Sequence, residues 1–196
     1  WTILSVKFKD YKSGFVQLTN KYSRIRLLFI VLMIQIIFGG LMAGMRAGLL
    51  HPHWPVFVSG ESFFNALGNL ESFQSDDLLN YEPSVFLKSW VQLIHRILAY
   101  VVAAMVIFYA VRFIPKLQTL MRSKKNETYS HIYSQIVSSH WFSVVLVILQ
   151  LVLGILTVMY SFGSIPVVLG VLHQAVAIIL VMSILKLVYL YRPVHN

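Results

Sequence analysis

Residues 91–100 read VQLIHRILAY, and residues 171–176 read VLHQAV. Each stretch places one histidine inside a run of apolar residues that is long enough to cross a membrane. An ionisable side chain is costly to keep within hydrocarbon, so a histidine in such a run indicates a functional site. His95 and His173 are therefore the first candidates for a site in this chain.

The composition predicts an integral membrane protein. Of the 196 residues, 58% are hydrophobic and only 12% are charged, whereas a soluble domain carries about 25% charged residues. Cysteine is absent, which excludes disulfides, thiolate metal sites and cysteine nucleophiles. The net charge of +9 comes from basic residues beside the apolar runs. This placement is typical of membrane topology, so we expect no nucleic-acid partner.

Four apolar segments are long enough to span a bilayer. The residues before them, 1–26, form a basic linker on the cytoplasmic side, and its start resembles the end of a preceding helix. We therefore expect a processed product or one part of a longer chain. Residues 27–196 form the membrane domain, with spans at about 27–48, 89–113, 139–160 and 166–191.

The charges orient these spans. Basic residues dominate 5–26, 114–138 and the C-terminal tail, which places these segments on the cytoplasmic side. The long acidic loop 49–88 and the short turn 161–165 then face the outer side. A loop of this length favours a short helix or a lid within it. The sequence predicts an all-α protein, a bundle of four transmembrane helices.

The pair His95 and His173 lies at one predicted depth. The second and fourth spans both enter from the outer side and run parallel. His95 lies about five residues into its span and His173 about seven residues past Pro166. At about 1.5 Å per residue, both rings are roughly 8–11 Å from the outer boundary. Two imidazoles at one depth on separate helices suit a metalloporphyrin that takes one axial nitrogen from each side.

Small residues would leave room for such a ring. Ala99 follows His95 by one turn, and Gly170 and Ala177 flank His173. A zinc or copper site would need a third or fourth ligand at the same depth, and no Asp or Glu occurs within the four spans. Each histidine could instead be a packing residue that is hydrogen-bonded to a neighbouring helix.

Two arginines lie at the outer level, where the propionates of an upright haem would emerge. Arg46 ends the first span, and Arg96 follows His95 directly. Arginine matches a carboxylate in a bidentate fashion, although both side chains could also extend toward the lipid headgroups.

Other patterns carry weaker predictions. Gly40, Gly44 and Gly48 share one face of the first span, which permits close approach of another helix or a flat ligand. The pair His51 and His53 can bind metal, but its place beside the membrane favours a polar interfacial role. His140 has no partner at its depth and is expected at the interface.

Taken together, these motifs resemble the haem A synthases of cytochrome oxidase biogenesis. The resemblance covers about residues 22–190 and is carried by residues 39–48 (GGLMAGMRAG) with the following Trp54-Pro55, 91–99 (VQLIHRILA), 149–157 (LQLVLGILT) and 172–174 (LHQ). Members of that family have eight spans in two pseudo-symmetric four-helix halves, and this chain resembles the C-terminal half.

The resemblance implies that His95 and His173 are the axial ligands of a bis-histidine haem b. In the family, the N-terminal half binds haem O and holds a glutamate implicated in catalysis. This chain has no intramembrane glutamate and no second histidine pair. The resemblance therefore implies no catalytic residue here. It implies the haem b-binding half of an oxidoreductase that converts the haem O methyl group to the formyl group of haem A.

Two alternatives stay open, a free-standing four-helix membrane cytochrome b for electron transfer and a haem-free oxidase assembly factor. Besides the lipid membrane, the expected partners are the N-terminal four-helix half and an electron donor, either a quinol or a ferredoxin. Haem O synthase and a second copy of the chain are further candidates. The lack of a presequence favours the bacterial plasma membrane over the mitochondrial inner membrane.

Overall fold

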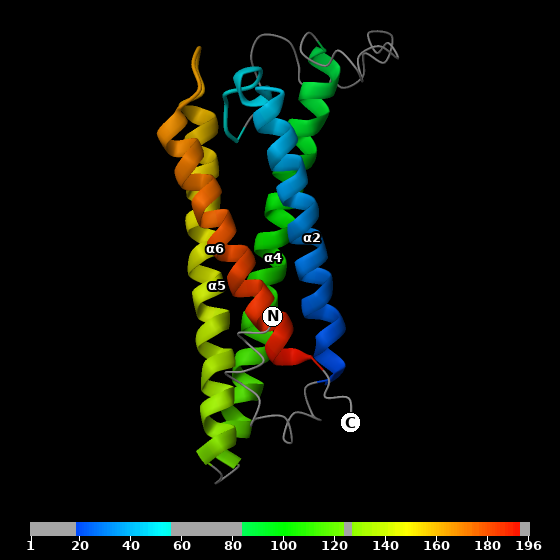
Figure 1. Ribbon diagram of the computed structural model, residues 1–196, viewed down its shortest axis with the longest axis vertical. Coiled ribbons are helices and arrows are strands. Elements are labelled where there is room, and N and C mark those ends of the chain that lie inside the picture. Colours follow the sequence, from blue (N-terminus) through cyan, green and yellow to red (C-terminus); the bar gives the residue numbers. More distant parts are fainter. Residues whose placement is uncertain (1–18, 56–83, 124–126, 193–196) are drawn as a thin grey trace. The chain divides into compact units, whose positions relative to one another are not determined.

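The computed structural model describes residues 19–55, 84–123 and 127–192. Within these residues the chain forms long α-helices and one short 3₁₀ helix, without any strand (Figure 1). The elements are α2 (Thr19–Gly44), η2 (Ala47–Leu49), α4 (Val85–Ser123), α5 (Glu127–Met159) and α6 (Val167–Tyr191).

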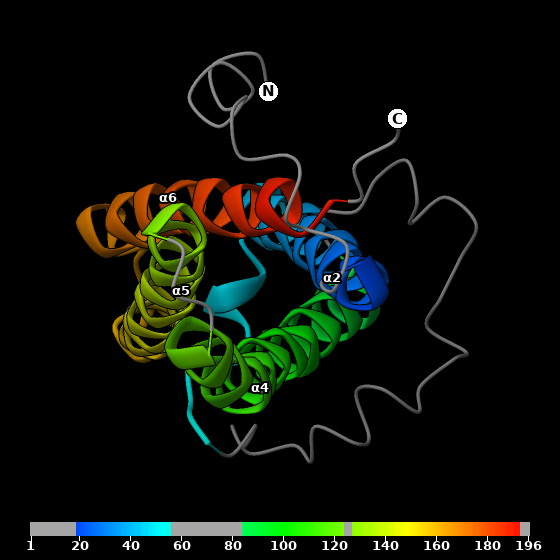
Figure 2. The ribbon, with the colours of Figure 1, turned by 90° about the horizontal axis from the view of Figure 1, so that it is seen from below.

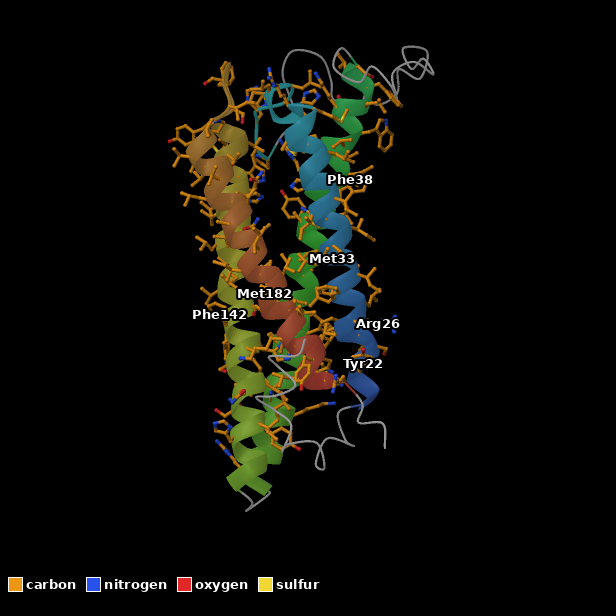
Figure 3. All side chains as sticks on the ribbon, in the orientation of Figure 1. Tyr22, Arg26, Met33, Phe38, Phe142 and Met182 are labelled. Carbon is orange, nitrogen blue, oxygen red and sulfur yellow. The ribbon has the colours of Figure 1, made fainter. Side chains whose placement is uncertain are left out.

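In the described part of the chain, all four α-helices contain a segment that is long and apolar enough to cross a membrane. These spans are Tyr22–Gly44, Val85–Thr119, His131–Met159 and Val167–Tyr191. Large apolar side chains remain exposed on the helices, such as Phe142 at 52% and Met182 at 61%, both labelled in Figure 3. Such surfaces suit lipid, and helices satisfy their own backbone hydrogen bonds there. The prediction of an all-α integral membrane protein with four transmembrane helices is confirmed.

Helix α2 differs at both ends from the span predicted at 27–48. It begins at Thr19, so residues 19–26 are helical and do not belong to a linker. Neither Gly nor Pro interrupts these residues, and the helix can therefore continue through them. The helix ends at Gly44 because Arg46 adopts a left-handed backbone conformation with φ 51°. The remaining linker residues, 1–18, lie outside the described residues.

The next two helices are longer than the predicted spans. Helix α4 extends beyond 89–113 at both ends, and α5 begins well before residue 139. Hydrophobicity marks only the part of a helix that suits a membrane, whereas the backbone pattern continues into polar residues that still form helix. The predicted loop 49–88 is correspondingly shorter. Its middle, residues 56–83, where a short helix or lid was expected, lies outside the described part of the chain.

Helix α6 begins at Val167, directly after Pro166, close to the predicted start at residue 166. The carbonyl of Pro166 accepts a hydrogen bond from the backbone N–H of Gly170 at 3.0 Å. Proline is well suited to this position because the first N–H groups of a helix have no intrahelical acceptor.

The chain divides into two compact units, and each unit takes a segment from every α-helix. The first unit comprises Trp1–Met33, Val102–Ile148 and Ile178–Asn196. Its core is apolar, with fully buried side chains that include Ile25, Leu28, Phe113, Leu117, Ile136, Leu180, Ile184 and Leu187.

His140 lies inside this apolar core, and its expected depth at the membrane interface stays a prediction. It is only 2% exposed, and its Nε2 lies 3.0 Å from the hydroxyl of Tyr191. The ring of Phe113 packs edge-on against it, with 6.1 Å between the ring centroids. Tyr191 supplies a hydrogen-bond partner from α6, so the imidazole is satisfied without water.

The second unit comprises Ile34–Val101 and Leu149–Ala177. Its apolar cluster is small and consists of the buried Met45, Ala47 and Val91 with Phe38, Met42 and Leu87 packed against it; Phe38 is labelled in Figure 3. Figure 2, which looks along the helices, shows α2 beside α4 and α5 beside α6. Polar side chains lie between the members of both pairs in this unit. All the candidate site residues belong to it.

Candidate functional site

His95 and His173 both belong to the second unit. They lie on α4 and α6. The similar depth expected from the sequence stays a prediction, and α4 begins at Val85 and not at Ser89.

The ring of His95 is held by two residues of α2. Its Nε2 lies 3.4 Å from Nε2 of Gln35. On the adjoining edge of the ring, a Cβ atom added to Gly39 would lie 3.1 Å from Cε1 and 3.6 Å from Nδ1. Gln35 and Gly39 are one helical turn apart, so they lie on the same face of α2. No side chain larger than that of glycine would fit at residue 39 without moving the ring.

His173 has the same surroundings on α5. Its Nε2 lies 3.1 Å from Nε2 of Gln150, and a Cβ atom at Gly154 would lie 3.0 Å from its Cε1. Gln150 and Gly154 are again one turn apart. The motif Gln-x-x-x-Gly thus occurs on α2 and on α5, and each copy holds one histidine from another helix.

Several polar atoms in this arrangement are buried. Within the described residues, Nδ1 of His95 and of His173 and Oε1 of Gln35 and of Gln150 have no hydrogen-bond partner. An unpaired buried polar atom costs free energy. Four such atoms on two histidines and the glutamines that contact them are more typical of a binding site than of a packed core.

Arg96 turns toward the backbone of the loop that follows η2. Its Nη2 donates to the carbonyl of His51 at 3.1 Å and to the carbonyl of His53 at 2.9 Å. Nε2 of Gln92 also donates to the carbonyl of His51, at 2.8 Å. We name residues 51–55 the outer strap. The side chains of Gln92 and Arg96 on α4 therefore bind main-chain carbonyl groups of the strap.

Side chains of the strap add further contacts. Ser89 donates its hydroxyl to the carbonyl of Val85 at 2.8 Å, so at 3.0 Å it accepts a hydrogen bond from Nε2–H of His51. Trp54 donates its indole N–H to the hydroxyl of Tyr100 at 2.9 Å.

His51 is only 5% exposed and lies beside a cation. Burial, with smaller contributions from the charges of Arg96 and His53, holds the pKa of His51 below its ordinary value. The neutral ring suits the hydrogen bond to Ser89. His53 instead packs edge-on against Phe162, with 5.9 Å between the ring centroids. His51 makes polar contacts, as predicted for the pair. The rings of His51 and His53 contact different residues, Ser89 and Phe162.

The remaining predicted residues have mixed outcomes. Arg46 is exposed and lies at the end of α2. Nothing lies within 4 Å of a Cβ atom at Gly40, Gly44 or Gly170. Among the described residues no other helix approaches Gly40 or Gly44, and Gly39 lies on the face that meets α4. The alternative predicted for these glycines, close approach of a flat ligand, stays a prediction, as does the room for a ring beside Gly170.

Among the described residues, no group of three or more His, Cys, Asp or Glu side chains could hold a metal ion. His95 and His173 offer two imidazole nitrogens within one unit. A porphyrin supplies four nitrogens and leaves two axial positions, which histidine fills in many haem proteins. The donor set fits that group.

Sequence reasoning missed Gln35 and its equivalence to Gln150. The signal was present, because a glutamine within an apolar span is costly and indicates a partner. The repeat Gln-x-x-x-Gly would then have pointed to Gly39 ahead of the other glycines of α2. The contacts of Gln92 and Arg96 with the strap carried no such signal, since their acceptors are main-chain carbonyls.

Comparison with known proteins gives a consistent result. The family model described as cytochrome oxidase assembly protein, COX15-CtaA, matches residues 1–185. The chain is 35% identical over 180 residues to a protein of Flavobacterium psychrophilum named heme A synthase, covering 92% of this chain and 45% of that relative. It is 36% identical over 149 residues to the heme A synthase of Flavobacterium johnsoniae, covering 76% of this chain and 37% of the relative.

A heme A synthase of Wolbachia pipientis is 27% identical over 189 residues, covering 92% of this chain and 44% of the relative. The chain spans about half the length of the curated relatives that it matches, or less. No solved structure matches it significantly. These relatives are bacterial, in agreement with the predicted bacterial membrane.

Proposed function

The chain belongs to the family of cytochrome oxidase assembly proteins, and we propose that it acts in haem A biosynthesis as the half of a haem A synthase that binds haem b. The observation that carries this proposal is that His95 and His173 lie in one unit and each contacts a Gln-x-x-x-Gly motif of another helix. The relatives named heme A synthase support the pathway, and the coverage of 45% supports the assignment to one half.

In this proposal His95 and His173 would hold the haem iron, one imidazole from α4 and one from α6. Held in this way, the haem would supply one-electron transfer. The protein contributes the two ligands, a largely buried setting, and the glycines that let the imidazoles lie close to α2 and α5. Burial and nearby charge would tune the reduction potential.

The two arginines have different parts in the proposal. Arg96 is buried and donates to two carbonyls of the strap, so it holds the strap beside the site. Arg46 is exposed, and its charge would attract a haem propionate. Arg96 would add to the same positive field because its guanidinium stays charged.

The oxidation of the haem O methyl group belongs in this proposal to the other four-helix half. No Asp or Glu lies within the four described spans, so none of them offers a carboxylate for proton transfer. The expected partners are that half and an electron donor, a quinol or a ferredoxin. Haem O synthase and a second copy of the chain are further possible partners.

The first test is a reduced-minus-oxidised absorption spectrum of the purified protein. We expect b-type bands in the wild type and their loss in His95→Ala and in His173→Ala. His131→Ala is the matched control, because His131 is an exposed histidine of α5 outside the second unit. Bands that survive the double replacement of His95 and His173, or their absence from the folded wild type, would overturn the proposal.

A second test addresses the division of labour. The chain supplied with haem O should form no haem A by itself. Co-expression with the N-terminal half of a relative should restore formyl formation, measured by the pyridine haemochrome spectrum. Formation of haem A by the chain alone would show that catalysis does not require the other half.

A further inference from the structure

The two glutamines that contact the histidines occupy equivalent positions. Gln35 and Gly39 of α2 contact adjoining atoms of the His95 ring, and Gln150 and Gly154 of α5 do the same at His173. In both cases the amide meets Nε2, and the glycine faces the Cε1–Nδ1 edge. A glutamine that only needed some partner in the membrane would have no reason to select the same ring atom twice.

The contact defines which ring nitrogen carries the proton. An amide nitrogen can only donate, so in each contact Nε2 must be the acceptor. A neutral imidazole has one N–H, and the proton therefore lies on Nδ1 of both rings. Each histidine thus has its lone pair on Nε2, which is the state needed to bind a metal through that atom.

We propose that Gln35 and Gln150 are placeholders that hold Nε2 of His95 and His173 until the haem iron takes it. This inference rests on the proposed function. At each histidine, the hydrogen bond from the amide to Nε2 breaks and a bond from Nε2 to iron forms. Nδ1 keeps its proton throughout, so no proton is gained or lost and no electron moves in the exchange.

The two contacts differ in strength. The distance between nitrogens is 3.1 Å for Gln150 and 3.4 Å for Gln35. A shorter hydrogen bond competes better with a metal, since hydrogen bonds weaken at the long end of this range. Gln150 should therefore be the stronger placeholder, and the effect of its removal should be larger.

The test is a haem b titration of the apoprotein in detergent, for the wild type, Gln35→Leu and Gln150→Leu. Leucine is similar in volume and cannot donate to Nε2. We expect Gln150→Leu to bind haem about two- to tenfold more tightly than the wild type, in line with the net contribution of one hydrogen bond. Gln35→Leu should show a smaller gain. Weaker or unchanged binding by Gln150→Leu would overturn the inference.

Gln135→Leu is the matched control. Gln135 lies on α5 and contacts His131 at 3.4 Å, but this pair is exposed and lies in the first unit. Its removal tests a glutamine–histidine contact of the same kind away from the site. We expect no change in haem affinity, and a gain equal to that of Gln150→Leu would contradict the placeholder role.

A second measurement does not involve haem. ¹⁵N chemical shifts of the histidine rings in the apoprotein report the tautomer directly. We expect Nδ1–H for His95 and His173 in the wild type, and a shift toward Nε2–H for His173 in Gln150→Leu. Wild-type rings protonated on Nε2 would overturn the inference while leaving the proposed function intact. Failure of every variant to bind haem b would overturn both.

Discussion

The guanidinium of Arg96 donates to the main-chain carbonyl of His53 at 2.9 Å, although Arg96 directly follows His95 in the sequence. Two consecutive residues of α4 thus contact different parts of the protein, because side chains one position apart on a helix point in different directions. His95 contacts α2, and Arg96 fixes the outer strap.

Replacing Arg96 should therefore loosen the strap. In Arg96→Ala the carbonyls of His51 and His53 lose a charged donor, and a hydrogen bond to a charged group contributes about 1.5–3 kcal/mol. We expect hydrogen exchange at the backbone amides of His51, His53 and Trp54 to accelerate about tenfold or more. Arg112→Ala, at an exposed arginine of the same helix, should leave their exchange unchanged. Equal exchange in both variants would show that Arg96 does not hold the strap.

Replacing a glycine of these helices by alanine should lower the thermal midpoint at some positions and raise it at others. In the apoprotein, Gly39→Ala and Gly154→Ala should lower the thermal midpoint, because the new Cβ atoms would lie 3.1 and 3.0 Å from a histidine Cε1, and overpacking costs about 1–3 kcal/mol. Gly40→Ala meets nothing within 4 Å and should raise the midpoint, since alanine stabilises a helix interior by about 0.5–1 kcal/mol relative to glycine. A higher midpoint for Gly154→Ala would contradict the close contact with His173.

The strap should weaken in acid. Burial and the charge of Arg96 hold the pKa of His51 below its ordinary value, so the open strap binds a proton more readily than the closed one. The stabilisation is complete above about pH 6.5 and decreases as the pH falls below that value toward the lowered pKa. Exchange of the strap amides, corrected for its intrinsic pH dependence, should therefore rise below pH 6.5. His51→Gln retains a donor for Ser89 without a titrating ring, and the acid response should largely disappear; a response that persists unchanged would exclude His51 as its source.

A substitution in the core of the first unit should lower the stability of the protein without changing haem b binding at the site. Tyr191→Phe removes the hydrogen bond to His140 Nε2 and should cost about 1 kcal/mol of stability, seen as a lower thermal midpoint. Haem b binding should be unchanged, because Tyr191 belongs to the first unit. Tyr160→Phe, at a tyrosine that is 65% exposed, is the control and should leave the midpoint unchanged. Loss of haem b in Tyr191→Phe would show that the core of the first unit also supports the site.

The amino-acid sequence by itself determined the membrane class, the number of spanning helices and the two histidines as candidates. These follow from hydrophobic run length and from the cost of an ionisable group in hydrocarbon, which are properties of single segments. The family was also recognisable from the quoted motifs. Helix ends were less predictable: α2 stops at Gly44 because of the backbone conformation of Arg46, which no hydrophobicity pattern records.

Only the tertiary structure decided what surrounds each histidine. Gln35 is 60 positions from His95 along the chain, and which of several glycines meets a ring depends on how far each helix is rotated about its axis. The partners of Arg96 are carbonyl groups, which every residue possesses, so no side-chain pattern could identify them. Contacts between separate helices depend on packing of whole faces, and for that reason the pairing of Gln-x-x-x-Gly with each histidine became visible only in the folded chain.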